Sequence, residues 1–168
     1  MMFGQKNHEK PIEWSKISLT WENFEAFPPS ENPEHAATSS TGITYSWSYS
    51  TAQGVPELRF SVHTYFYPKK SWVDSLRKNP ALLKHEQLHF DISELYARKL
   101  LKALKEYVAM RNIRVDLREI HREIEAERKF LQNQYDKETR HGTDKAAQLQ
   151  WEKTIQEELK KLEKYKRN

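Results

Sequence analysis

The hydrophobic pattern of this 168-residue chain changes its period between the first third and the second half, which restricts the folds open to it. In residues 43–49 and 58–66, apolar or aromatic side chains alternate with polar ones, as expected of two half-buried strands. The segment 52–56 between them is turn-like, so an antiparallel hairpin is predicted. The segment 28–40, rich in Pro, Ser, Asn and Thr, is predicted to be a loop.

Helical periodicity governs the rest of the chain. Ser71 and Asn79 are suitable helix caps, and Pro80 is an acceptable first residue of a helix. Two further long helices are predicted over about 115–135 and 147–162. Strands followed by helices predict an α+β fold, in one domain that spans the whole chain.

The string His85-Glu86-Gln87-Leu88-His89 lies in the helix that is predicted to begin near Pro80. Each helical residue advances about 100°, so His85 and His89 lie roughly 40° apart on one face, and both imidazoles can reach one ion. Glu86 lies beside that face, which suits a base that takes a proton from metal-bound water. This is the pattern of a metallopeptidase zinc site. The alternative interpretation is an amphipathic helix whose histidines are surface or core residues.

A hydrolytic zinc site needs a third protein ligand and one open position. The chain has no cysteine, which excludes thiolate ligands, disulfides and thiol catalysis. Asp91 and Glu94 point well away from the two histidines on the helix. We favour His141, because it precedes Gly142 between two helical patterns, where a loop can turn a side chain back.

The remaining histidines are His8, His35, His63 and His121. His63 falls on the polar face of a predicted strand and His121 within a predicted helix, so both are expected to be solvated.

The ion would lower the pKa of bound water from about 15.7 to around 7, so that Glu86 accepts its proton near neutral pH. The developing oxyanion needs a second donor, for which Tyr135 is the candidate; the alternative for Tyr135 is a packing aromatic at a helix end. Asp136 is placed to orient a ligand imidazole. Tyr96 lies about 16 Å further along the helix than the first motif histidine and is expected in the core.

Several strings beyond the five-residue motif resemble a known family. The stronger ones are 83–92, the segment from Tyr135 to Gly142, and then Gln148 and Trp151; weaker ones are 19–24 and 36–43. They resemble a bacterial domain-of-unknown-function family that is identified as a predicted secreted zinc-dependent protease of the zincin-like group.

That resemblance implies a zincin-like fold and a zinc metallopeptidase. It implies His85 and His89 as metal ligands, Glu86 as catalytic base and His141 as third ligand. The third position has two alternative ligands, Asp136 and Asp144. In zincin-like folds a strand ahead of the metal helix borders the cleft and can pair with extended substrate, a role that residues 57–67 could serve. The alternative is that this strand only packs.

Charge and hydropathy limit the partners. The net charge is +4, with a sequence pI near 9.1, and the tail 160–167 is basic. Interleaved glutamates make this a mixed-sign helix face, which predicts a solvated surface and no nucleic-acid partner. No segment is apolar enough to cross a membrane. The start lacks a signal region, so the chain is expected to be cytoplasmic or a mature form, and the resemblance favours export to the periplasm or medium.

Two functions of different classes follow. In the first, the chain hydrolyses peptide or protein substrates with Zn²⁺; in the second, it is a metal-containing or metal-free module whose helices bind a partner protein. An open coordination position favours the first, and a fourth protein ligand favours the second.

Overall fold

Strands precede helices in the folded chain, as the change of period predicts. The computed structural model describes residues 10–15, 18–31, 33–52, 54, 57–108 and 112–167. Its elements run in the order β1 (Ile12–Glu13), β2 (Ala37–Thr38), β3 (Thr41–Ser50), β4 (Glu57–Phe66), β5 (Trp72–Val73), α1 (Pro80–Glu106), α2 (Ile113–Thr139) and α3 (Lys145–Lys161). The predicted α+β class is confirmed.

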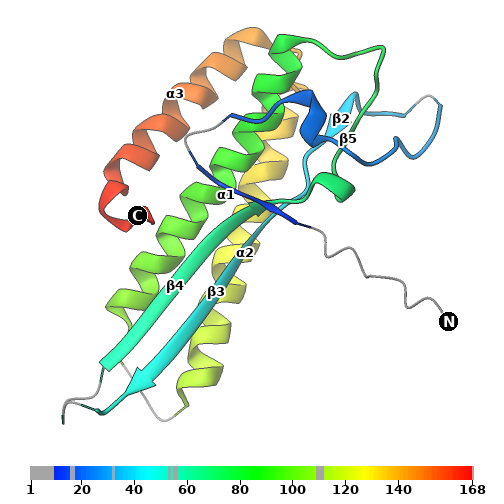
Figure 1. Cartoon of the computed structure of the whole chain (residues 1–168). Helices are drawn as coiled ribbons and strands as arrows, with labels where there is room; N and C mark the ends of the chain where they lie inside the picture. The colour runs from blue at the N-terminus through cyan, green and yellow to red at the C-terminus, as the bar shows by residue number, and fades with distance from the viewer. Residues whose placement is uncertain are drawn as a thin grey trace, which may run out of the picture.

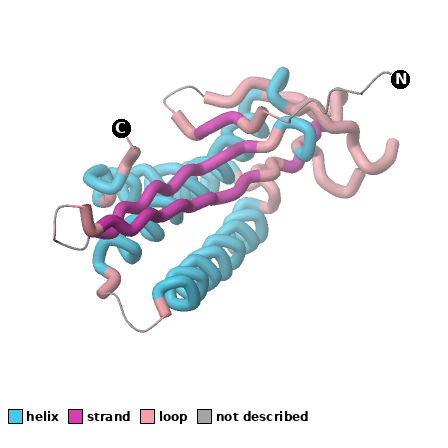
Figure 2. The backbone as a smooth tube through the Cα atoms, turned by 60° about the horizontal axis from the view of Figure 1, so that its bottom comes forward, coloured by secondary structure: helices cyan, strands magenta, loops and turns pink. Residues whose placement is uncertain are grey.

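β3 and β4 form the predicted antiparallel hairpin, in which Ile43 pairs with Thr64 and Tyr45 with Val62. The predicted turn 52–56 lies only partly within the described residues. β1 pairs with the end of β4, which gives the strand order β1-β4-β3. This sheet lies over the helices, with its long strands running alongside them, as Figure 2 shows, and its apolar side packs against α1.

A second, small sheet corrects the prediction that residues 28–40 are only loop. β2 falls within that segment and pairs with β5 in antiparallel fashion. Ser71 is not a helix N-cap as predicted, because residues 72–73 are strand. Its hydroxyl instead donates to the Tyr67 carbonyl at 2.8 Å and accepts the Ser40 N–H at 2.9 Å. These two bonds hold the approach to β3 against the approach to β5.

α1 is the central element. It begins where predicted, because the Asn79 side chain accepts the Leu82 N–H at 2.9 Å and Pro80 opens the first turn. Figure 1 shows the β1-β4-β3 sheet on one side of α1, with α2 and α3 packed elsewhere around it. His85 and His89 therefore lie on a helix that packs against other elements on several sides.

α2 is longer than predicted. It continues to Thr139, so Asp136 is helical and not part of a loop. No Gly or Pro interrupts the helix, and it ends only where Arg140 adopts a left-handed conformation with φ of 49°. The Asp136 side chain thereby has a fixed direction, one helical turn after Gln132.

The core surrounds α1 in two clusters. The larger lies between the sheet and the helices and includes Tyr96, which confirms the prediction for that residue. Its fully buried aliphatic members are Ile92, Leu95, Leu100, Leu104, Leu117 and Ile155. The smaller cluster surrounds Phe66 and Phe90 and connects the first third of the chain to α1.

A buried ion pair lies within α1, and its arginine also bonds α3. Arg98 has only 2 % of its side chain exposed, and its Nε donates to Glu94 Oε1 at 2.9 Å. Arg98 also donates to the Leu159 carbonyl at 2.6 Å, and Glu94 accepts the Thr64 hydroxyl at 2.9 Å. Burial raises the pKa of Glu94, and the bonds from Arg98 and Thr64 oppose that shift. Arg98 therefore stabilises the charged form of the buried Glu94 carboxylate.

Replacing Arg98 with methionine is expected to destabilise the fold by about 3–5 kcal/mol, because Glu94 keeps its burial and loses its cation. Urea unfolding followed by circular dichroism measures the loss. The matched control is Arg122→Met, since the Arg122–Glu119 pair on α2 is exposed, with 70 % of the arginine side chain accessible; a change within about 0.5 kcal/mol is expected there. Equal effects of the two substitutions would contradict the role assigned to Arg98.

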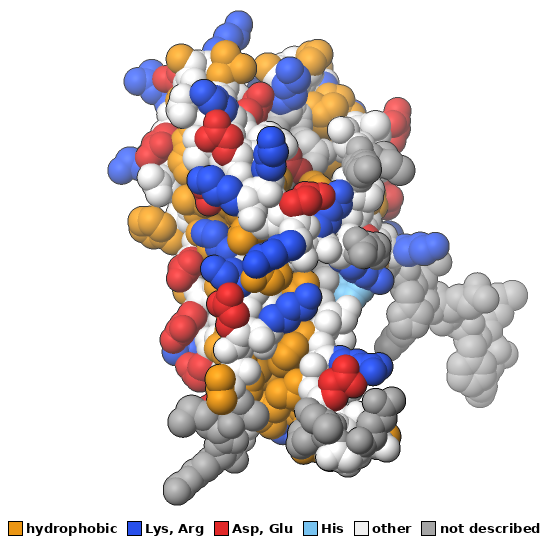
Figure 3. All heavy atoms as spheres, turned by 90° about the vertical axis from the view of Figure 1, so that its left-hand side faces the viewer, with side chains coloured by type: hydrophobic (Ala, Val, Ile, Leu, Met, Phe, Trp, Pro, Cys, Tyr) orange, Lys and Arg blue, Asp and Glu red, His pale blue; other side chains and the backbone are white. Residues whose placement is uncertain are grey.

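The surface on the α3 side carries mixed charge. In Figure 3 blue and red side chains alternate over this face, and ion pairs such as Lys161–Glu158 lie within it. None of the helices in the described ranges has the length and apolar character needed to cross a membrane.

Candidate metal centre

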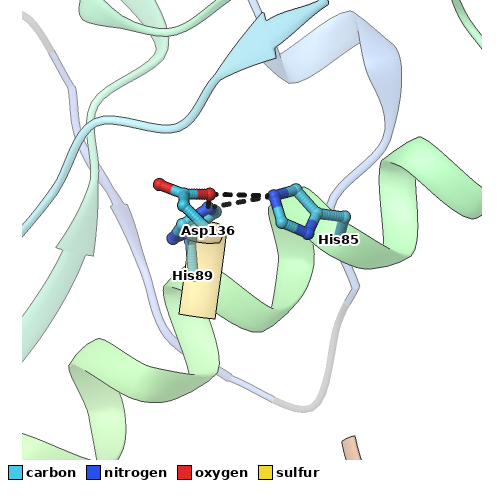
Figure 4. Close-up of side chains that lie close together, drawn as sticks. All are labelled: His85, His89 and Asp136. Carbon is cyan, nitrogen blue, oxygen red and sulfur yellow. Dashed lines mark hydrogen bonds and ion pairs between the residues drawn. The ribbon is translucent and has the colours of Figure 1, made fainter. Parts of the chain in front are cut away.

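Three polar atoms from two helices converge on one point. His85 Nε2 and His89 Nε2, both from α1, lie 3.1 and 3.0 Å from Oδ1 of Asp136 on α2. The two Nε2 atoms are 3.3 Å apart. Figure 4 shows all three side chains directed at each other. Within the described part of the chain, no other group of three or more His, Asp or Glu side chains has its ligand atoms so close together.

The tautomer of His85 is set by Gln148. Nδ1 of His85 lies 3.2 Å from Gln148 Oε1, which also accepts the Tyr135 hydroxyl at 2.8 Å. The amide of Gln148 cannot be reversed, because its Nε2 donates to Glu152 at 3.0 Å. An amide oxygen only accepts, so Nδ1 of His85 carries the proton and Nε2 of the neutral ring has a free lone pair.

The tautomer of His89 is set in the same way by Gln132. Oε1 of Gln132 accepts from His89 Nδ1. Its Nε2 donates to the His89 carbonyl at 2.8 Å and to Ser93 Oγ at 3.2 Å, which fixes the orientation of this amide as well. The neutral His89 ring therefore also presents a bare Nε2 to Asp136.

The resulting donor set fits a small cation with tetrahedral geometry. Two imidazole lone pairs and one carboxylate oxygen face each other. All three are hydrogen-bond acceptors that repel one another unless a cation or protons lie between them. Ligands at about 2.0–2.1 Å from a tetrahedral ion are about 3.3–3.4 Å apart. The separation of 3.3 Å between the two Nε2 atoms agrees with that spacing, and the distances of 3.0 and 3.1 Å to Asp136 are slightly shorter.

The electrostatics of the group point the same way. When no ion is bound, a proton on Nε2 takes the place of the cation and makes the contact with Asp136 a hydrogen bond. Burial alone would lower the pKa of His89, but this bond and the charges of Glu86 and Asp136 outweigh burial and raise it. Burial would raise the pKa of Asp136, but the bonds from His85 and His89 hold it well below its ordinary value. The centre thus favours positive charge between a carboxylate and two imidazoles.

Glu86 lies beside the three converging atoms, and its side chain does not belong to that group. Its side chain lines the same cleft although the residue is only 3 % exposed, and its Oε2 has no hydrogen-bond partner. A buried carboxylate oxygen without a donor is costly. An oxygen of this kind is suited to accept a proton from a molecule that enters the cleft.

The cleft itself is open and has a volume of about 560 Å³. Its base contains the motif residues of α1, one wall is the polar face of α2, and the opposite wall is the extended segment that contains β2. The wall residues of that segment are Ala36, Ala37, Thr38, Ser39, Ser40 and Thr41. The expectation that residues 57–67 border the cleft is wrong, because this wall lies earlier in the chain.

Gly142 packs directly on His85. A Cβ at this position would lie 2.9 Å from both Cβ and Cγ of His85, and its φ of 80° is one that other residues rarely adopt. The turn between α2 and α3 thereby brings backbone, and not a side chain, against the His85 ring.

Tyr135 lies beneath the centre. Its ring stacks on His85 with centroids 4.6 Å apart, and the residue is fully buried. Its hydroxyl is directed to Gln148 and, at 3.2 Å, to the His85 carbonyl. Burial raises the pKa of this hydroxyl. The contacts match the packing alternative, and a role as oxyanion donor stays a prediction.

His141 lies next to the centre, at the edge of the cleft. Its Nδ1 is 3.5 Å from Asp136 Oδ1, its side chain is 51 % exposed, and its φ is 53°. Its ring lies 4.4 Å from that of His35, which lines the same cleft. The structure thus places Asp136, predicted as an alternative ligand or as an orienting residue, between His85 and His89, with His141 beyond it.

The other candidates have different roles. Asp144 caps α3 by accepting the Ala147 N–H at 3.0 Å. His63 is not simply solvated, because it bonds Ser61 and Glu13 on the outer side of the sheet. His121 is also not solvated: its ring packs 4.9 Å from Tyr45 and its Nε2 is buried. His8 lies outside the described residues.

Gln132 and Gln148 contact the two histidines, a placement that the sequence does not predict: Gln132 belongs to none of the motif strings, and Gln148 enters the resemblance without a role. Gln132 precedes Asp136 by one helical turn, which is a signal once the length of α2 is known. Gln148 lies in α3 and meets His85 only through the tertiary fold.

A comparison with known protein families gives a match whose range includes this centre. A family model described as "Bacterial protein of unknown function (DUF922)" matches residues 17–142. The matched range holds the three converging side chains and ends before α3. No curated protein and no solved structure gives a significant match. Because the family model covers most of the chain, the protein belongs to the bacterial family of unknown function DUF922.

Proposed function

We propose that the chain is a zinc-dependent metallopeptidase of the zincin-like kind, in which His85, His89 and Asp136 hold the ion. The observation that carries the proposal is the convergence of two bare Nε2 atoms and one carboxylate oxygen at tetrahedral spacing. The resemblance of the motif strings to predicted zinc proteases supports it. A buried, unpaired carboxylate beside the group supports hydrolysis over simple metal storage.

Glu86 is the general base in this proposal. Zinc bound at the centre supplies an acidified water and polarises the substrate carbonyl. Glu86 takes the proton of the attacking water on its free oxygen and returns it to the leaving amine. The burial of Glu86 keeps that oxygen free of competing donors.

The β2 wall is suited to hold an extended peptide. β2 pairs with β5 on one edge, and no other described strand covers its second edge. Main-chain groups on a free strand edge bind an added strand by hydrogen bonds. A peptide bound along Ala37 and Thr38 would cross the cleft above the α1 ligands.

His141 is the oxyanion donor that the geometry favours. It lies in the open cleft beside Asp136, whereas the Tyr135 hydroxyl is buried and already bonded to Gln148. We therefore assign the donor role to His141 and a packing role to Tyr135.

Metal content and hydrolysis, measured together, test the proposal. We expect one zinc per chain after reconstitution and cleavage of a fluorescent, unfolded protein substrate. Dialysis against a chelator should abolish cleavage, and added zinc should restore it, whereas chelator saturated with zinc should have no effect. A chain that binds no zinc, or that binds it and cleaves neither this substrate nor a peptide library, would favour the partner-binding module.

A further inference from the structure

The two imidazoles of the centre share an uncommon kind of partner. Metal-ligating histidines usually donate their second N–H to a carboxylate, a backbone carbonyl or water. In this chain each Nδ1 faces the side-chain oxygen of a glutamine, Gln148 for His85 and Gln132 for His89. A neutral amide fixes the tautomer, as a carboxylate does, but adds no negative charge to the ligand.

Both glutamines are themselves held in place. Gln148 is buried, accepts the Tyr135 hydroxyl and donates to Glu152. Gln132 donates to Ser93, a fully buried hydroxyl on α1. Neither amide is free to turn its nitrogen toward the ring it serves.

The Ser93 hydroxyl extends this support to the cleft wall. It lies 2.7 Å from the Thr41 hydroxyl at the start of β3 and accepts a hydrogen bond from Arg128 at 3.1 Å. Arg128 is in turn bonded through two nitrogens to Glu125. Side chains of α1, α2 and β3 thus fix the orientation of Gln132.

We propose that Gln132 and Gln148 are positioning residues, which set the metal affinity of the centre by holding the Nε2 lone pairs of His89 and His85 toward the ion. The inference rests on the proposed function, since it concerns the same centre. It gives α3 a part in that centre, although the family model ends at residue 142.

Substitutions that change the charge of the Gln148 side chain distinguish a positioning role from simple packing. Gln148→Met keeps the bulk and removes the acceptor, so zinc affinity should fall by about 10–100-fold. Gln148→Glu, made together with Glu152→Gln so that residue 152 supplies the donor for the second carboxylate oxygen, keeps the acceptor for His85 and adds charge. The charge makes the imidazole a stronger donor, so zinc affinity should equal or exceed that of Glu152→Gln alone. A residue that only fills space would show no such opposite response.

Competition with a chromogenic zinc chelator measures the affinity, and the visible spectrum of the Co²⁺ form reports the ligand geometry. Gln132→Met should lose affinity as Gln148→Met does. Gln134→Met on α2 and Gln150→Met on α3 are the matched controls, because these amides bond Glu138 and Thr154 at the surface. Both controls should match the native chain.

Two results would overturn the inference and leave the metal centre standing. One is native affinity in both Gln132→Met and Gln148→Met; the other is an equal loss in Gln148→Met and in the double variant Gln148→Glu with Glu152→Gln, which indicates packing alone. A native chain that binds neither zinc nor Co²⁺ would instead overturn the proposed function. Thermal unfolding of each metal-free variant shows that it is folded.

Discussion

Glu86→Gln is expected to lower kcat for peptide cleavage by about 10²–10⁴-fold while zinc stays bound. Glutamine has the same shape but cannot accept a proton at neutral pH. The substitution also removes a buried carboxylate whose Oε2 has no donor, so the melting temperature should not fall. Steady-state kinetics with metal analysis of the same sample gives both quantities.

Glu106→Gln is the control for this substitution, because Glu106 is an exposed glutamate at the end of the same helix. It should leave kcat and zinc content unchanged. If Glu86→Gln cleaves at the native rate with zinc bound, another group is the base and the role assigned to Glu86 is wrong.

Asp136→Ala is expected to weaken zinc binding more than about 100-fold, beyond the usual cost of losing a partner that only supports a ligand. His141→Ala should keep zinc within about tenfold and lose kcat by about 10²–10³-fold, as removal of an oxyanion donor does. The physical reason is placement: the Asp136 oxygen lies 3.0–3.1 Å from both ligand nitrogens, and His141 lies beyond it. Isothermal titration with zinc and steady-state kinetics separate the two effects.

The reverse pattern is equally informative. Loss of zinc in His141→Ala with retention in Asp136→Ala would make His141 the third ligand, as the sequence predicts. Loss in both would indicate four protein ligands, and a closed site favours the binding module. His63→Ala is the control, because His63 bonds Ser61 and Glu13 on the outer side of the sheet and does not line the cleft; zinc binding and kcat should match the native chain.

The part of the centre on α1 could be predicted because it is local. Asn79 and Pro80 mark the start of the helix, and helical spacing alone puts His85 and His89 on one face. The hairpin was equally predictable, since alternation in β3 and β4 reflects one face on the core.

The sequence did not predict where α2 ends, and the placement of Asp136 depends on that end. Apolar periodicity fades after Leu131, and nothing in the next residues stops the helix before Arg140 turns left-handed. Extending α2 to Thr139 changes Asp136 from a loop residue to one that projects toward α1. His141 then falls after the helix and outside the group of three. The boundary of a helix is less predictable from sequence than its existence, because no strong local signal fixes it here.

The three-sided enclosure of His85 has a consequence for how the ion binds. Tyr135 stacks on the ring, Gln148 holds its Nδ1, and the backbone of Gly142 closes against it. The rotamer entropy of this ligand is therefore lost when the chain folds and not when the ion arrives. An ion that enters the cleft would meet a His85 side chain that is already immobile. Its binding free energy would therefore not be reduced by the entropic cost of ordering that side chain.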